Sequence, residues 1–108
     1  MARVFRVECC HRKGPYNAKC CPRPPGLGEC NSPAPCVDGI GSGYSRNYPG
    51  VFGFATRDQY ERWFPENVRA ALRAAGFRLV EYEGDIVAKG RSQVLFMRTR
   101  AIAVFECA

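Results

Sequence analysis

The feature that most constrains this chain is a long stretch in which neither a helix nor a central strand can persist. Residues 11–49 hold seven of the eight prolines, six of the eleven glycines and four of the seven cysteines. Proline removes a backbone donor and glycine removes backbone restraint, so regular structure is interrupted throughout this stretch. A structureless segment of this length is uncommon in a small domain and is usually functional, cross-linked or partly disordered. We therefore predict an irregular arm at residues 11–49, inserted after a first strand.

The chain length predicts one domain that spans residues 1–108, because 108 residues is close to the commonest domain size. A hydrophobic fraction of 46% and a charged fraction of 24% exclude wholesale disorder. No apolar run approaches the roughly 18 residues that a membrane span needs. Arginines interrupt the N-terminal segment where a signal peptide would carry its apolar core. We expect an intracellular protein without membrane contact.

Outside the arm, the hydrophobic pattern predicts both strands and helices. Thr56 and Gln59 have the spacing of a capping box and start a helix at 57–64. Pro65 opens a second helix at 66–75, and Gly76 ends it. The predicted strands are 3–10, 51–54, 77–82, 86–89, 93–97 and 101–107, with turns at 83–85 and 98–100. The fold class is α+β: a mostly antiparallel sheet, a short two-helix layer and the long Cys/Pro/Gly-rich arm.

The arginines on these elements fall into two groups. Arg69 and Arg73 lie on the outer face of the second helix and are predicted to be solvated. Arg98 and Arg100 lie in the predicted turn, where a solvated and a functional role both stay open. Arg6 differs because it lies between apolar residues on the first strand. A guanidinium near a core needs an acceptor, and Glu8 is the nearest one on the same face. This pair is either structural or lines a ligand cleft.

The net charge of +6 predicts an acidic partner, and thirteen of the sixteen basic residues are arginine. Arginine is preferred for bidentate contacts with phosphate and carboxylate groups. The partner would be a protein or ribonucleoprotein complex, or nucleic acid. A GC-rich genome is an alternative explanation of the arginine preference, although it does not cancel the charge. The residues predicted to bind are Arg12, Lys13, Lys19, Arg23, Tyr44, Arg46 and Tyr48.

The aromatic residues nearer the helices are predicted to belong to the core instead. They carry most of the available apolar area. They are Phe52, Phe54, Trp63 and Phe64.

Cysteine is the second unusual residue, with six of the seven cysteines in the first 36 positions. An odd number without a secretory signal argues against a disulfide framework. One cysteine from each part of the arm could hold a structural zinc ion, with Cys10, Cys20, Cys30 and Cys36 as ligands and His11 as an additional candidate. The alternative is that these are ordinary thiols. Cys10 and His11 are predicted to face apart, as neighbours on a strand do.

Several short motifs together resemble a group of small phage and prophage proteins. They begin with Val4-Phe5-Arg6-Val7-Glu8 and Gly14-Pro15-Tyr16, and continue with Pro33, Asp38-Gly39, Phe52-Gly53-Phe54 and Trp63-Phe64. They end with Gly76-Phe77 and with Gly90 followed by Gln93-Val94-Leu95-Phe96. The resemblance covers roughly residues 3–97 and implies a protein that acts in the host cytoplasm.

More distantly, the order of these motifs resembles a reduced ADP-ribosyltransferase. That resemblance implies NAD as cofactor and gives Arg6 the role of the family's first-strand Arg or His, with Glu8 beside it. It places Thr56 near the family's Ser/Thr strand, and Gln93 where the family carries its catalytic Glu. Glutamine cannot supply the carboxylate charge, so the resemblance in fold can persist while the chemistry is lost.

The predicted function is binding to a host defence nucleoprotein complex and inhibiting it without catalysis. This rests on an analogy of size and origin with anti-CRISPR proteins. The alternatives are an NAD-using enzyme that resembles an ADP-ribosyltransferase, and a zinc-stabilised module that binds nucleic acid. Zinc and NAD are therefore expected only under those alternatives.

Overall fold

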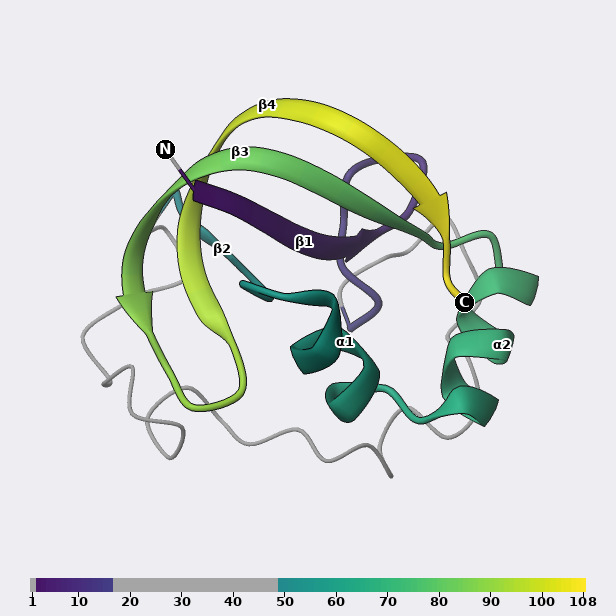
Figure 1. Cartoon of the computed structure of the whole chain (residues 1–108). Coiled ribbons are helices and arrows are strands. Elements are labelled where there is room, and N and C mark those ends of the chain that lie inside the picture. Colours follow the sequence, from purple (N-terminus) through teal and green to yellow (C-terminus); the bar gives the residue numbers. More distant parts are fainter. Residues whose placement is uncertain (1, 17–48) are drawn as a thin grey trace.

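The computed structural model describes residues 2–16 and 49–108. The elements in this part of the chain are β1 (Ala2–Glu8), β2 (Val51–Gly53), α1 (Arg57–Trp63), α2 (Glu66–Ala74), β3 (Arg78–Lys89) and β4 (Val94–Glu106). The α+β class is therefore confirmed. Figure 1 shows β3 and β4 arching over β1, with both helices on the inner side of the arch. The described residues include no helix long and apolar enough to span a membrane.

The four described strands form an antiparallel sheet in the order β1-β3-β4-β2, and this sheet curls back on itself. Beyond the end of β2, Phe54 pairs with Phe5 of β1. The two residues exchange two backbone hydrogen bonds, each 2.7 Å long. The first and last strands in the sheet order therefore meet, and part of the open edge of the sheet is closed.

The prediction of four short strands between residues 77 and 107 is wrong, because β3 and β4 are two long strands. Their pairing is shifted three times, where Ile102 and Thr99 on β4 and Val87 on β3 are extra residues in the ladder. Such bulges bend and twist a strand without ending it. Charged residues at 83–85 and 98–100 therefore stay in the sheet instead of forming turns.

Two glycines permit the close approach of the strands in this curled sheet. A Cβ atom on Gly84 would lie 2.8 Å from the Met97 carbonyl oxygen and 2.8 Å from the Phe96 ring. A Cβ atom on Gly53 would overlap the Phe5 carbonyl oxygen and lie 2.7 Å from the same ring. Gly84, predicted to sit in a turn, is instead a position where only hydrogen leaves room for the neighbouring strand.

The helices follow their local signals closely. The Gln59 amide donates to Thr56 Oγ1 (3.1 Å), and the Gln59 side chain accepts from the Ala55 amide (2.8 Å). Gly76 has a φ of 96°, as expected for a residue that ends a helix. Both predicted helices are confirmed to within one residue at their C-terminal ends.

The prediction that Arg69 and Arg73 are only solvated is wrong. Arg69 Nη1 donates to the carbonyl oxygens of Phe64 (2.6 Å) and Glu61 (3.1 Å) at the end of α1. Arg73 Nη1 donates to the Cys107 carbonyl oxygen (3.0 Å). The carbonyl groups that Arg69 contacts lie at the end of α1 and lack partners within the helix, so a cation is stabilised there.

Two buried clusters form the core. One packs α1 and α2 against the sheet and contains Val7, Cys9, Phe54, Tyr60, Trp63, Phe64, Val68, Leu72, Phe77, Leu79 and Cys107. The other lies within the curl and contains Val4, Val80, Tyr82, Val94 and Phe96. Phe52 was predicted to be core but is 38% exposed. Neighbouring residues on a strand face opposite sides, so Phe52 points away from its buried neighbours.

Candidate functional site

The most concentrated polar cluster in the described residues surrounds the carboxylate of Glu8, which is only 3% exposed. Arg6 Nη1 lies 2.7 Å and Arg98 Nη1 lies 2.5 Å from Glu8 Oε2. The Tyr82 hydroxyl donates to Glu8 Oε1. We call these four residues the Glu8 network. It joins β1, β3 and β4, and it confirms that Glu8 is the acceptor for Arg6.

The Glu8 network holds two guanidinium groups against one carboxylate, so it carries an excess positive charge. Burial lowers the pKa of Arg6, and the negative charge of Glu8 opposes that effect. Burial raises the pKa of Tyr82, and its hydrogen bond to Glu8 adds to the increase. The Arg98 guanidinium also lies 5.9 Å from the centre of the Tyr82 ring, within range of a cation–π interaction.

The network also fixes the backbone on both sides of the arm. Arg6 Nε donates to the Phe52 carbonyl oxygen (3.1 Å). Arg6 Nη1 and Arg98 Nη1 both donate to the Arg12 carbonyl oxygen, at 3.4 Å and 3.2 Å. Trp63 Nε1 donates to the Tyr16 hydroxyl (3.3 Å), which ties Tyr16 to α1. Of the two interpretations of Arg6 and Glu8, these contacts favour the structural one.

Two members of the Glu8 network, Arg98 and Tyr82, were missed from the sequence, and Arg98 was predicted to lie in a turn. The bulge at Thr99 keeps Arg98 in β4, and its register partner is Gly84, two residues beyond Tyr82. No local signal marks such a contact. The contact between Arg98 and the buried Glu8 carboxylate can be foreseen only when the strand pairing is known.

The residues suggested by the transferase resemblance have different local roles. Arg6 and Glu8 are in contact, as described above. The Thr56 hydroxyl caps α1. Gln93 is buried at the connection between β3 and β4, where its carbonyl oxygen accepts from the Gly90 amide (2.8 Å). The enzymatic interpretation stays a prediction.

Most of the predicted binding and metal residues lie outside the described residues. These are Lys19, Arg23, Tyr44, Arg46 and Tyr48 for binding, and Cys20, Cys30 and Cys36 for zinc. Arg12 and Lys13 are described and exposed. Within residues 2–16 and 49–108, no group of three or more potential metal ligands comes together. The zinc site therefore also stays a prediction.

The prediction that Cys10 and His11 face apart is wrong. Cys10 Sγ lies 3.3 Å from His11 Nδ1, and both side chains are exposed. The prediction assumed a strand through residue 10, but β1 ends at Glu8. A tight turn follows, in which the Arg12 amide donates to the Cys9 carbonyl oxygen (3.0 Å) and the Cys9 amide donates to the Lys13 carbonyl oxygen (2.9 Å). The alternation of a strand no longer applies there.

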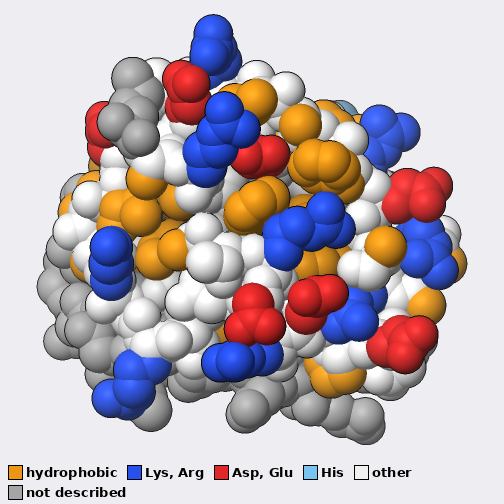
Figure 2. Space-filling view, in the orientation of Figure 1, with side chains coloured by type: hydrophobic (Ala, Val, Ile, Leu, Met, Phe, Trp, Pro, Cys, Tyr) orange, Lys and Arg blue, Asp and Glu red, His pale blue; other side chains and the backbone are white. Residues whose placement is uncertain are grey.

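A second region of the surface is marked by exposed arginines that have no carboxylate partner among the described residues. Figure 2 shows cationic side chains spread among acidic and apolar ones on the face in view, so density alone selects no patch. Arg3, Arg6, Arg62, Arg98 and Arg100 each contact a carboxylate.

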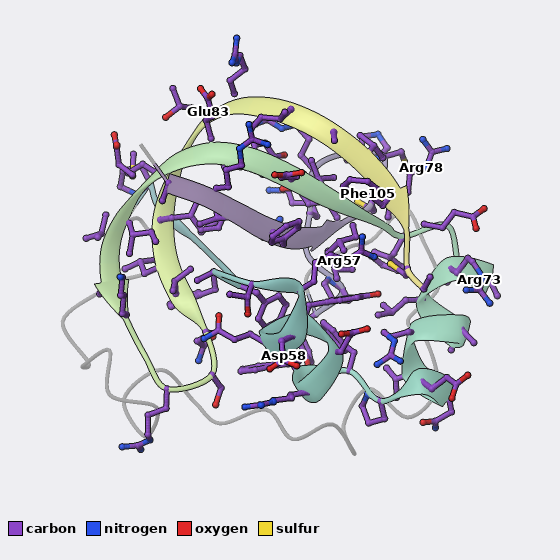
Figure 3. All side chains as sticks on the ribbon, viewed as in Figure 1. Arg57, Asp58, Arg73, Arg78, Glu83 and Phe105 are labelled. Atoms are coloured by element: carbon purple, nitrogen blue, oxygen red, sulfur yellow. The ribbon has the colours of Figure 1, made fainter. Side chains whose placement is uncertain are left out.

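Three exposed arginines among the described residues have no such contact and lie near one end of the sheet (Figure 3). The Arg57 guanidinium lies 5.1 Å from the centre of the Phe105 ring, which is 37% exposed. Arg73 reaches the backbone of Cys107, and Arg78 pairs in register with Glu106. We call Arg57, Arg73, Arg78 and Phe105 the basic end. No local sequence pattern marks the basic end, because its members come from four separate elements.

One known protein family matches almost the whole chain. Residues 1–107 match the family described as bacteriophage T4 Y00F protein. The chain belongs to the bacteriophage T4 Y00F protein family. The match extends across all six elements, and so the Glu8 network and the basic end both lie within the Y00F region. Membership of this family confirms the expectation of a phage protein. No curated protein and no solved structure matches the chain.

Proposed function

We propose that this Y00F-family protein binds a host defence nucleoprotein complex and inhibits it without catalysis, using the basic end as part of its docking surface. The observation that carries the proposal is the set of exposed arginines at the basic end that have no carboxylate partner among the described residues. Arginine forms its strongest contacts with carboxylate and phosphate groups, and an acidic partner would supply them.

The chemistry of the basic end fits a macromolecular partner. The exposed Phe105 ring offers apolar area within the basic end, and Arg57 lies over it. Aromatic and arginine side chains are enriched among residues that dominate binding energy at protein interfaces. A net charge of +6 would also speed association with an acidic surface. Inhibition would follow from occupying a surface that the complex needs for its nucleic acid or for an acidic subunit.

The Glu8 network has a different part in this proposal. Its two arginines and its carboxylate contact one another, and they hold the backbone of Arg12 and Phe52. The proposal therefore assigns it a structural role, which is to fix the chain on both sides of the arm. Arg12 and Lys13 would add to the docking surface as exposed cations.

The test measures co-purification of the protein with a panel of guide-loaded CRISPR effector complexes at moderate salt, with bulk DNA and RNA as separate arms. The double variant Arg57→Glu/Arg73→Gln should bind at least about tenfold more weakly than the wild type. Arg62→Glu/Arg100→Gln is the matched control, because it makes the same charge change at arginines already paired with Asp58 and Glu83. The control should bind like the wild type.

Three results would contradict the proposal. If the wild type binds no effector complex, the assigned partner is wrong. If bulk DNA or RNA binds as tightly as the complexes, the protein is a general nucleic-acid binder. If the control loses as much binding as the basic-end variant, the basic end is not the docking surface.

A further inference from the structure

The second half of β4 has one edge without a neighbouring strand among the described residues. β2 spans only Val51–Gly53 and pairs with residues 94–96, whereas β4 continues to Glu106. Beyond residue 96, the described pairing of β4 is with β3 alone. Figure 1 shows this part of β4 along the outer border of the arch. An edge strand carries a row of backbone N–H and C=O groups with which another extended chain can pair.

The regular part of this edge is its C-terminal end. The bulges at Thr99 and Ile102 interrupt the ladder between β3 and β4, and bulges hinder pairing along an edge. Residues 103–106 pair with residues 78–81 of β3 without interruption. We call residues 103–106 the free edge. A further strand can extend the sheet there with regular hydrogen bonds.

The free edge exposes apolar side chains on both faces of the sheet. Val104 is 54% exposed, and the adjacent Phe105 is exposed as well. Neighbouring residues on a strand face opposite sides, so each face offers one of these side chains. In contrast, Val94 and Leu95 are buried in the part of β4 that lies beside β2. A strand on the free edge would likewise cover part of Val104 and Phe105.

The charges around the free edge favour an acidic partner. Arg57, Arg73 and Arg78 of the basic end are exposed and contact no carboxylate among the described residues. Arg57 lies over Phe105, and Arg78 pairs in register with Glu106. The arginines outnumber Glu106, so this end of the sheet is positive. A second copy of the chain would bring the same arginines, and like-charge repulsion therefore disfavours it.

The backbone of the free edge favours a polypeptide over a nucleic acid. Its N–H donors and C=O acceptors alternate, and an extended peptide supplies the complementary groups. The phosphate groups of a nucleic acid offer acceptors only. They would leave the carbonyl groups of the edge unpaired, which costs free energy wherever water is excluded.

We propose that the free edge binds an extended acidic segment of a partner protein, which adds to the sheet as a further strand. Backbone hydrogen bonds to residues 103–106 hold the segment, and Val104 and Phe105 contact its apolar side chains. Arg57 and Arg78 pair with its carboxylates. The inference rests on the proposed function for the basic end as a docking surface, and it adds the kind of partner segment and the way in which it binds.

The test uses the full-length, isotope-labelled protein and a probe peptide of about seven residues, the length of an ordinary strand, in which valine and glutamate alternate. In the free protein, alternate amides of residues 103–106 should exchange rapidly with solvent, because alternate amides of an antiparallel strand point away from its neighbour. In an NMR titration, the peptide should shift the resonances of these amides. Excess peptide should slow their exchange several-fold, since bound amides are protected.

Two matched peptides separate the backbone from the charge. N-methylation of the central residues removes the donors and keeps the carboxylates. It should weaken binding at least about tenfold, as the loss of two backbone hydrogen bonds implies. Replacing each glutamate by lysine should abolish measurable binding, because the lysines would face the arginines of the basic end.

Two double variants test the arginines. Arg57→Gln/Arg78→Gln should bind the probe peptide about fivefold more weakly, the effect expected for two exposed charge pairs. Arg3→Gln/Arg62→Gln is the matched control, because it removes the same charge from exposed arginines already paired with carboxylates, and it should bind like the wild type. Circular dichroism confirms that each variant is folded, which is expected because all four positions are exposed.

Several results would overturn the inference. No shift at residues 103–106 with millimolar peptide means that the edge does not bind it. Amides already protected in the dilute free protein mean that the chain itself covers the edge, and protection that grows with protein concentration assigns the edge to a second copy. Equal binding of the N-methylated peptide excludes strand pairing, and equal binding of the lysine peptide excludes an acidic partner. An oligonucleotide that protects the same amides would assign the edge to nucleic acid.

The control variant and the co-purification test complete the comparison. If Arg3→Gln/Arg62→Gln weakens binding as much as Arg57→Gln/Arg78→Gln, the basic end does not hold the carboxylates. Co-purification with effector complexes does not involve the probe peptide, so the two proposals can fail separately. A failure of strand pairing leaves the basic end as a docking surface through its side chains. A failure to bind any effector complex leaves the acidic strand as a partner of the free edge.

Discussion

Arg98 and Glu8 are 90 residues apart in the chain, yet Arg98 Nη1 lies 2.5 Å from Glu8 Oε2. This contact connects the last strand to the first across β3. The same carboxylate oxygen accepts from Arg6, which in turn reaches the backbone at Phe52 and Arg12. The buried Glu8 side chain therefore stabilises both the closure of the sheet and the position of the turn that carries Cys10 and His11.

Replacing the Glu8 carboxylate by an amide should destabilise the protein strongly. Glu8→Gln leaves two guanidinium groups without their anion, and breaking a buried ion pair typically costs about 3–5 kcal/mol. We expect a lower urea midpoint with little change in the slope of the transition, measured by circular dichroism.

Glu83→Gln is the matched control for this measurement. Glu83 contacts Arg100 at 3.1 Å, but the Arg100 side chain is 70% exposed. Exposed pairs contribute about 0–1 kcal/mol, so this variant should unfold almost like the wild type. Equal effects of the two substitutions would mean that the Glu8 network has no special role in stability.

The sequence predicted the helices better than the strands, and the reason is the range of the signals. Thr56, Pro65 and Gly76 act on the backbone within a few residues, so helix ends were predicted to within one residue. The continuity of β3 and β4 depends on bulges at Thr99 and Ile102, which arise only when two distant strands pair. Charged residues and Gly84 within those strands therefore resembled turns.

The candidate site was predictable to the same limited extent. Arg6 and Glu8 share a strand face, and their pairing follows from the alternation of side chains alone. Arg98 and Tyr82 reach Glu8 only through the register of three strands. The contact between Cys10 and His11 depends on where β1 ends, and strand ends are the least certain feature of a sequence pattern.

Adding a methyl group at Gly53 should disturb the closure of the sheet. The new Cβ atom in Gly53→Ala would overlap the Phe5 carbonyl oxygen and lie 2.7 Å from the Phe96 ring, both held within the core. Overpacking of this kind costs about 1–3 kcal/mol, which urea unfolding would report. Gly14→Ala is the comparison, because its Cβ atom would come no closer than 3.2 Å to any neighbour, at Arg6 Nη2. A Gly53→Ala protein as stable as Gly14→Ala would show that β1 and β2 do not approach so closely.

The stability of the protein should fall in alkaline solution. Burial raises the pKa of Tyr60 and of Tyr82 above 10.0, and that of Cys107 above 9.0. The folded state therefore holds these protons more tightly than the unfolded state does. The stabilisation is fully present below about pH 9 and is lost as the pH rises through the folded-state values, by up to about 1.4 kcal/mol per pH unit for each group. Urea unfolding under reducing conditions between pH 8 and pH 11 measures this loss.

Removing the hydroxyl of Tyr60 should weaken that alkaline dependence without weakening the fold. The Tyr60 hydroxyl is buried and has no partner with normal hydrogen-bond geometry. The Cys107 thiol beside it raises its pKa further, in addition to the larger effect of burial, and a thiol is only a weak partner. A buried polar group without a partner costs about 1–3 kcal/mol, so Tyr60→Phe should be as stable as the wild type or more stable at pH 8. At pH 11 its advantage should be larger, because one raised pKa has been removed. A Tyr60→Phe protein that is less stable than the wild type at pH 8 would mean that the hydroxyl does have a hydrogen-bond partner in the folded state.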